Sequence, residues 1–81
     1  MPSPQPRPVQ ITTEYIELDK LLKREDCASS GGAARHLIDQ GLVRVNGAVE
    51  TRRRKKLRPG DTVSCMDALM VVRAALPRKE D

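Results

Sequence analysis

The chain has 81 residues, of which 15 are Lys or Arg and 11 are Asp or Glu, giving a net charge of +4. This length allows one small domain with modest stability. The sequence contains no apolar run near the roughly 18 residues of a membrane span and no apolar core of a secretion signal. We therefore expect a cytoplasmic protein with no membrane partner.

The charge is distributed unevenly along the chain. Residues 1–40 carry five basic and six acidic side chains, a net charge of −1, whereas residues 41–81 carry ten basic and five acidic side chains, a net charge of +5. Six of the seven residues in 52–58 are Arg or Lys. Such a concentrated cationic run predicts a polyanionic partner, for which nucleic acid is the default.

The residue types that support metal or nucleophilic chemistry are few. Cys27 and Cys65 are too few for a disulfide framework, and His36 does not complete a tetrahedral zinc set with them. We expect both cysteines to be buried or half-buried free thiols and His36 to face solvent. Because the sequence has neither a recognisable nucleophile–base pair nor a glycine-rich phosphate loop, we predict no catalytic residue, no metal and no cofactor.

The first segment has proline at every second position between Pro2 and Pro8. It has little apolar surface to offset the entropy of ordering, so we predict a disordered, extended arm over residues 1–10. The following stretch, residues 11–17, is rich in β-branched residues and includes an aromatic one, which favours a short strand.

Two short helices are expected next. Leu18, Leu21 and Leu22 lie at i, i+3 and i+4, the spacing of an amphipathic helix over residues 18–24. A second helix begins after Ser30, a good N-cap, and ends at Gly41, which can adopt the left-handed conformation. With their short connection, the two helices predict a helix-turn-helix-like pair.

The second half of the chain shows strand patterns. Val43 and Val45 alternate with Arg44, and Asn46-Gly47 is the strongest short signal for a β-hairpin, because a type I′ turn needs positive φ at both central residues. Further strands are predicted at 62–65 and 69–74, before a charged tail at 77–81. The element order predicts a single α+β domain over residues 11–76.

Several of these residues, in this order and at these spacings, resemble a known family. They are Leu18-Asp19, Ser30, Ala34-Arg35, Leu37-Ile38, Gly41, Val43, Val45-Asn46-Gly47 and Pro59-Gly60-Asp61. The pattern resembles the RNA-binding domain named after the fourth small-subunit ribosomal protein, the S-four domain, and in particular its small stand-alone bacterial members. The resemblance implies a short helix pair (αL motif) packed on a small curved antiparallel sheet, in a monomeric RNA-binding protein.

The resemblance and the charge pattern together suggest which residues contact RNA. Family members often carry Arg at the positions of Glu17 and Gly31, so the missing charge on the helices shifts the weight to the loop at 52–58. The candidate RNA-binding residues are Lys20, Ser30, Arg35, Arg44, Asn46, Gly47, Arg52, Arg53, Arg54, Lys55, Lys56 and Arg58. Ser30 and the Asn46-Gly47 pair are expected to act first as a helix cap and a turn.

The sequence also indicates how RNA would be recognised. Tyr15 is the single aromatic residue, whereas readers of single strands stack bases on several aromatic side chains. We therefore predict recognition of the phosphates, shape and 2′-hydroxyls of a structured RNA, ribosomal or transfer RNA, with ribosome association as a corollary. The alternative is a DNA-binding or protein-interaction module that uses the helix pair, although Gly31 to Ala34 provide no base-reading side chains.

Overall fold

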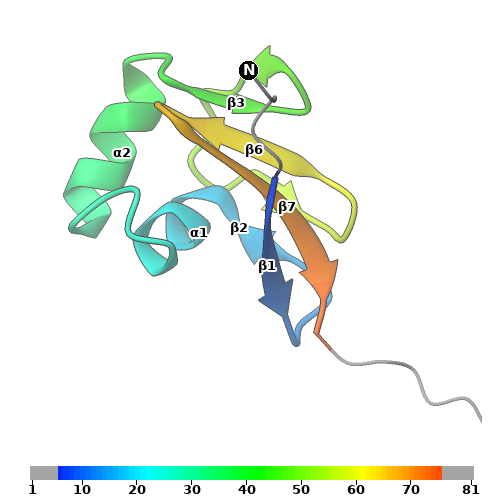
Figure 1. Cartoon of the computed structure of the whole chain (residues 1–81). Coiled ribbons are helices and arrows are strands. Elements are labelled where there is room, and N and C mark those ends of the chain that lie inside the picture. Colours follow the sequence, from blue (N-terminus) through cyan, green and yellow to red (C-terminus); the bar gives the residue numbers. More distant parts are fainter. Residues whose placement is uncertain (1–5, 76–81) are drawn as a thin grey trace, which may run out of the picture.

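The computed structural model describes residues 6–75 and shows two helices packed on a mixed β-sheet, which confirms the α+β prediction (Figure 1). The elements in chain order are β1 (Arg7–Ile11), β2 (Ile16–Glu17), α1 (Leu18–Arg24), α2 (Gly31–Asp39), β3 (Val43–Val45), β4 (Ala48–Val49), β5 (Lys56–Leu57), β6 (Thr62–Cys65) and β7 (Ala68–Ala74).

The main sheet has five strands in the order β1-β7-β6-β3-β4, and β2 and β5 form a separate two-stranded sheet. The β7–β6, β6–β3 and β3–β4 pairs are antiparallel, as expected. The β1–β7 pair is parallel, with Val9 opposite Val72. The prediction of a wholly antiparallel sheet is therefore wrong at this edge, because it left the first strand out of the sheet.

The prediction of a disordered arm over residues 1–10 is wrong from Arg7 onward, since Arg7–Ile11 forms strand β1. Val9 and Ile11 are buried in the core, whereas Pro8 is exposed. Proline is tolerated here because β1 is an edge strand. Residues 1–5 of the arm and the predicted charged tail at 77–81 lie outside the described residues. The predicted strand over residues 11–17 is confirmed only at its ends, because bends at 12–14 separate Ile11 of β1 from β2.

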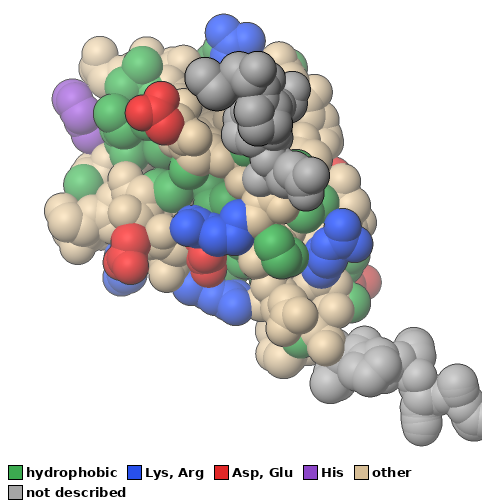
Figure 2. Space-filling view, viewed as in Figure 1, with side chains coloured by type: hydrophobic (Ala, Val, Ile, Leu, Met, Phe, Trp, Pro, Cys, Tyr) green, Lys and Arg blue, Asp and Glu red, His purple; other side chains and the backbone are tan. Residues whose placement is uncertain are grey.

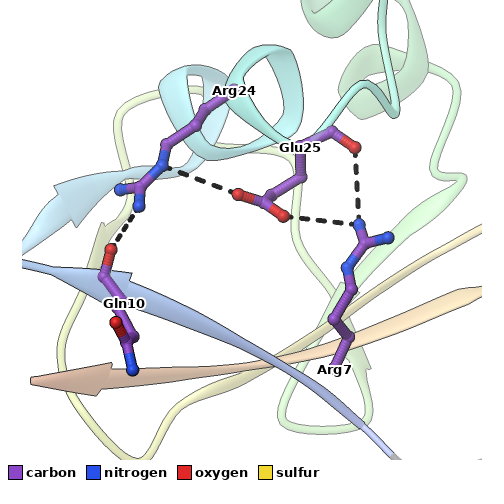
Figure 3. Close-up of polar contacts among 4 residues, drawn as sticks. All are labelled: Arg7, Gln10, Arg24 and Glu25. Carbon is purple, nitrogen blue, oxygen red and sulfur yellow. Dashed lines mark hydrogen bonds and ion pairs between the residues drawn. The ribbon is translucent and has the colours of Figure 1, made fainter. Parts of the chain in front are cut away.

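Side chains from two elements hold β1 against the end of α1 (Figure 3). Arg7 donates to the backbone oxygen of Glu25 at 3.4 Å and pairs with its carboxylate at 3.5 Å. Arg24 pairs with the same carboxylate at 3.5 Å and donates to the backbone oxygen of Gln10. These contacts join the first strand to the first helix, so residues 7–11 belong to the folded domain.

A test of this correction is the substitution Val9→Ala. Val9 is 1% exposed, so we expect the loss of its two methyl groups to lower the free energy of unfolding by about 2 kcal/mol. The measurement is denaturant unfolding followed by circular dichroism. Gln10→Ala, at the exposed neighbouring position of the same strand, is the matched control and should change stability by less than about 0.5 kcal/mol. Equal effects of the two substitutions would contradict the placement of β1 in the core.

Both helices agree with the sequence patterns. Helix α1 buries Leu18, Leu21 and Leu22. Ser30 caps α2, and its hydroxyl oxygen accepts a hydrogen bond from the backbone N–H of Ala33 at 3.1 Å. Gly41, after the last turn of α2, has a φ of 75°, which confirms the predicted helix end.

The hairpin between β3 and β4 also agrees with its sequence signal. Asn46 and Gly47 have φ values of 52° and 87°, and Val45 pairs with Ala48 across the turn. The Asn46 side chain adds contacts beyond the hairpin, because its amide donates to Asp61 Oδ1 at 3.1 Å and accepts from the backbone N–H of Thr62 at 2.9 Å. Asn46 therefore fastens the hairpin to the start of β6.

The two cysteines are free thiols, as expected. Cys65 is buried and Cys27 is half-buried. Burial, together with the smaller effect of the neighbouring Cys27, raises the pKa of the Cys65 thiol to about 11. Burial also raises the pKa of the Cys27 thiol. Both groups are therefore protonated near neutral pH, which makes them poor nucleophiles.

Candidate nucleic-acid interface

The segment from Arg52 to Arg58, called the basic loop below, is fixed to the start of helix α1. Strand β5 pairs with β2, with Leu57 opposite Ile16. The backbone N–H groups of Leu18 and Asp19 donate to the carbonyl oxygens of Lys55 at 2.9 Å and Arg53 at 3.1 Å. Backbone N–H groups in the first turn of a helix have no acceptor inside the helix. The basic loop supplies a carbonyl acceptor for each of these two. The loop is therefore held in place by the helix that it caps.

Burial of one residue gives the basic loop a defined orientation. Leu57 is fully buried in the core, whereas the neighbouring Lys56 and Arg58 are exposed. Turn residues at 53–54 precede the short strand β5. The first part of the basic loop is thus irregular, and only Lys56–Leu57 is regular strand.

Five of the six basic side chains surround one hollow. It has a volume of about 430 Å³ and is lined by Arg52, Arg54, Lys55, Lys56 and Arg58. Every one of its lining residues is cationic, so the hollow concentrates positive potential. An arrangement of this kind suits a chain of phosphates, because guanidinium groups bind phosphate oxygens in a bidentate manner and ammonium groups act as point charges.

The first cation of the loop has an acidic partner. Arg52 Nε donates to Glu50 Oε2 at 2.8 Å, and the backbone N–H of Arg52 donates to the same oxygen at 3.1 Å. The side-chain hydrogen bond from Arg52 holds the pKa of Glu50 below its usual value. Glu50 therefore remains ionised near neutral pH and offsets the charge of Arg52.

The last two cations of the loop lie over the aromatic ring of Tyr15. Lys56 Nζ is 4.9 Å and the Arg58 guanidinium carbon 5.9 Å from the ring centre. Cation–π contacts of this kind are worth about 0.5–1 kcal/mol at exposed sites. The half-buried Tyr15 therefore acts as a platform that positions two cations.

A second hollow shares Arg54 with the first. It has a volume of about 300 Å³ and is lined by Asp19, Arg35, Arg53 and Arg54. Arg53 makes a long ion pair with Asp39 of α2, at 3.9 Å. Because Arg54 lines both hollows, the basic loop and helix α2 present one continuous cationic surface, which we call the basic face; its cations are Arg35, Arg52, Arg53, Arg54, Lys55, Lys56 and Arg58.

The remaining candidates from the sequence line neither hollow. Lys20 pairs with Glu17 on α1 at 3.6 Å. Ser30 caps α2, and Asn46 and Gly47 form the β-hairpin. Arg44 is exposed on β3, on the side opposite to the buried Val43 and Val45. Contact of these five residues with RNA stays a prediction, whereas Arg35 and the basic loop are brought together by the fold.

Four residues of this region were missed as participants by sequence reasoning. Asp19, Asp39, Glu50 and Tyr15 contact or adjoin the basic face, although none of them belongs to the cationic run. Glu50 could have been found, because an acidic residue two positions before Arg52 is close enough to pair with it. The other three are distant in the chain from the cations that they adjoin, so only the fold brings them together.

The face in Figure 2 has a different character. Lys and Arg side chains stand apart on it, with acidic side chains between them, and apolar side chains gather near the helices.

Within residues 6–75, no group of three His, Cys, Asp or Glu side chains could hold a metal ion. Nor does any helix in this part of the chain have the length and apolarity to cross a membrane. The densest run of basic residues in the sequence, six of the seven residues at 52–58, lies on the basic face.

The family comparison identifies the class of domain to which this fold belongs. The model of the S4 domain matches residues 9–73, nearly the whole described structure. The chain thus belongs to the S4 domain family, as its sequence resemblance suggested. The match begins inside β1, in agreement with the finding that this strand belongs to the folded domain.

The chain is also similar in sequence to individual proteins. "Putative RNA-binding protein YbcJ" of Escherichia coli strain K12 is 50% identical over 50 residues, which cover 62% of this chain and 71% of the relative. "Probable ribosome maturation protein RlbA" of Bacillus subtilis strain 168 is 41% identical over 56 residues, 69% of this chain and 79% of the relative.

A solved structure is also similar. The solution structure of YbcJ from E. coli, whose description names an αL motif involved in RNA binding, superposes with a TM-score of 0.67 at 36% identity. The superposition covers 91% of this chain and 95% of that one. The two helices of the present structure correspond to the predicted αL motif on its sheet.

Proposed function

We propose that this protein is a non-catalytic RNA-binding module that holds structured RNA against its basic face. The observation that carries the proposal is the hollow of about 430 Å³ lined entirely by the cations of the basic loop. Family membership and the RNA-binding description of the similar E. coli structure support it. Neutralising phosphates releases condensed counterions, which gives such a surface its affinity.

The structure of the surface favours a folded RNA over an extended strand. Tyr15 is the single aromatic residue of the chain, and Lys56 and Arg58 lie over its ring. A ring occupied by two cations is not free to stack a base, so the chain lacks the stacking platforms of single-strand readers. Recognition would rest on phosphate geometry and on the 2′-hydroxyls of the wide minor groove.

The finer identity of the partner is also part of the proposal. We expect ribosomal or transfer RNA as the target and the cytoplasm as the location. The name of the B. subtilis relative, which refers to ribosome maturation, favours an RNA of the ribosome. Crosslinking in cells followed by sequencing of the bound RNA would identify it, and an abundance of ribosomal fragments is the expected result.

The class of ligand can be tested by a filter-binding titration at fixed salt. The protein should bind an RNA hairpin with a double-helical stem more tightly than a poly-pyrimidine strand of equal length. We expect a difference of about ten-fold or more, because base–aromatic stacking worth about 1–3 kcal/mol per base is missing from the single-strand complex. Equal affinities, or a preference for the single strand, would contradict recognition by shape and phosphates.

A further inference from the structure

The second hollow is lined by an acidic residue, Asp19, that has a carboxylate oxygen without a partner. Asp19 Oδ1 is buried and accepts no hydrogen bond from the described residues. The other residues lining the hollow are Arg35, Arg53 and Arg54. Among the ion pairs within residues 6–75, Arg53 pairs with Asp39, and none includes Asp19. Three arginines therefore line the same hollow as Asp19, and none of them forms an ion pair with its carboxylate.

We expect this oxygen atom to accept a hydrogen bond from a donor outside the protein. Buried carboxylate oxygens are almost always hydrogen bonded, and leaving one unpaired is costly. An ionised carboxylate can only accept hydrogen bonds. The missing component is therefore a hydrogen-bond donor that can enter a hollow of about 300 Å³.

The three arginines indicate what carries that donor. Guanidinium groups favour phosphate oxygens, so the ligand would have a hydroxyl or amino donor close to phosphates. In an RNA backbone, the ribose 2′-hydroxyl lies next to the 3′-phosphate. Donors on base edges are farther from the phosphates, and in a double helix the deep major groove keeps side chains away from them.

We propose that Asp19 accepts a hydrogen bond from a ribose 2′-hydroxyl while Arg35, Arg53 and Arg54 hold the adjacent phosphates. This inference rests on the proposed RNA-binding function and assigns Asp19 as the residue that distinguishes RNA from DNA. A carboxylate inside a phosphate-binding surface repels any nucleic acid. RNA compensates for the repulsion with its 2′-hydroxyl, whereas DNA has no donor there.

The experiment compares two ligands and three proteins. The ligands are a synthetic RNA hairpin with a double-helical stem and the same hairpin with 2′-fluoro in place of every 2′-hydroxyl, which keeps the A-form but cannot donate. The proteins are the full chain, Asp19→Ala and Asp19→Asn. The measured quantity is the ratio of the two dissociation constants at one salt concentration.

The unsubstituted chain should prefer the hydroxyl-bearing hairpin, and Asp19→Ala should reduce this preference about ten-fold, the effect of losing one hydrogen bond to a charged group. Asp19→Asn keeps an acceptor oxygen and should retain most of the preference. Both substitutions should tighten binding to the fluorinated hairpin, because a negative charge is removed. Asp67→Asn, an equal charge change at an exposed residue outside both hollows, should leave the preference unchanged.

The outcomes separate the inference from the function on which it rests. If the unsubstituted chain binds neither hairpin, the RNA-binding function itself is wrong. If the unsubstituted chain binds the RNA hairpin but Asp19→Ala keeps the same preference, the carboxylate acts only through its charge and the inference is overturned. Because Asp19 Oδ1 accepts no hydrogen bond in the described structure, both variants should fold, which thermal unfolding would verify.

Discussion

The double substitution of Arg54 and Lys56 by Gln is expected to remove about half of the salt dependence that the larger hollow contributes to RNA binding. Of the six cations in the basic loop, Arg52 is paired with Glu50, and Arg53 lines the second hollow instead of the first. Four cations remain for phosphates in the larger hollow. These four contacts contribute about −3 to −4 to the slope of the logarithm of affinity against the logarithm of salt, and the loss of two of them should flatten the slope by about two units.

This slope has a measurable consequence. Between about 50 and 200 mM salt, the double variant should therefore lose about ten-fold less affinity than the unsubstituted chain. The affinity of the variant should fall for all structured RNAs to a similar degree, since phosphate contacts carry no sequence information. The measurement is a filter-binding titration with an RNA hairpin at four or more salt concentrations.

A matched control removes the same charge elsewhere. Lys23→Gln combined with Arg73→Gln also lowers the net charge by two, at exposed residues outside both hollows. This control should keep a slope close to that of the unsubstituted chain. If the control and the loop variant flattened the slope equally, binding would depend on net charge and not on the basic face.

The second large effect is expected from Leu57→Ala, which should lower the free energy of unfolding by about 3 kcal/mol. Leu57 is fully buried although both of its neighbours in the chain are exposed cations. A domain of this size has a total stability of roughly 4–12 kcal/mol, so the loss is a large part of it. Because Leu57 anchors β5 beside β2, RNA binding should weaken as well.

Denaturant unfolding of the two variants Leu57→Ala and Arg54→Ala separates the two roles of the loop. Arg54 is exposed and makes no ion pair with the rest of residues 6–75, so its replacement should change stability by less than about 0.5 kcal/mol. It should nevertheless weaken RNA binding. A Leu57→Ala protein as stable as the unsubstituted chain would show that the loop is not anchored in the core.

The elements that were predicted correctly are determined by residues that are close to one another in the chain. Ser30 caps α2 through a group three residues away, and Asn46-Gly47 determines its own turn through two positive φ angles. Strand β1 was missed because its partner β7 lies about 60 positions later in the chain, and the alternation of Pro8 with buried Val9 is too short to show a strand by itself. Pairing between distant segments has no local signature.

The candidate site was predictable to a similar degree. The cationic run at 52–58 is visible in the sequence, and Arg35 follows from the family resemblance. The pairing of Arg52 with Glu50, the ring of Tyr15 beneath Lys56 and the unpartnered oxygen of Asp19 depend on how the chain folds. They decide which cations are available to phosphates, which the composition alone does not show.

The most direct test of the basic face is an NMR titration of the ¹⁵N-labelled chain with an RNA hairpin at constant salt. The largest amide shift changes should occur in the basic loop, around Asp19 and around Arg35, with small changes at Arg73 on the main sheet. The opposite pattern, with the largest changes on the sheet and a silent basic loop, would contradict the placement of the RNA site.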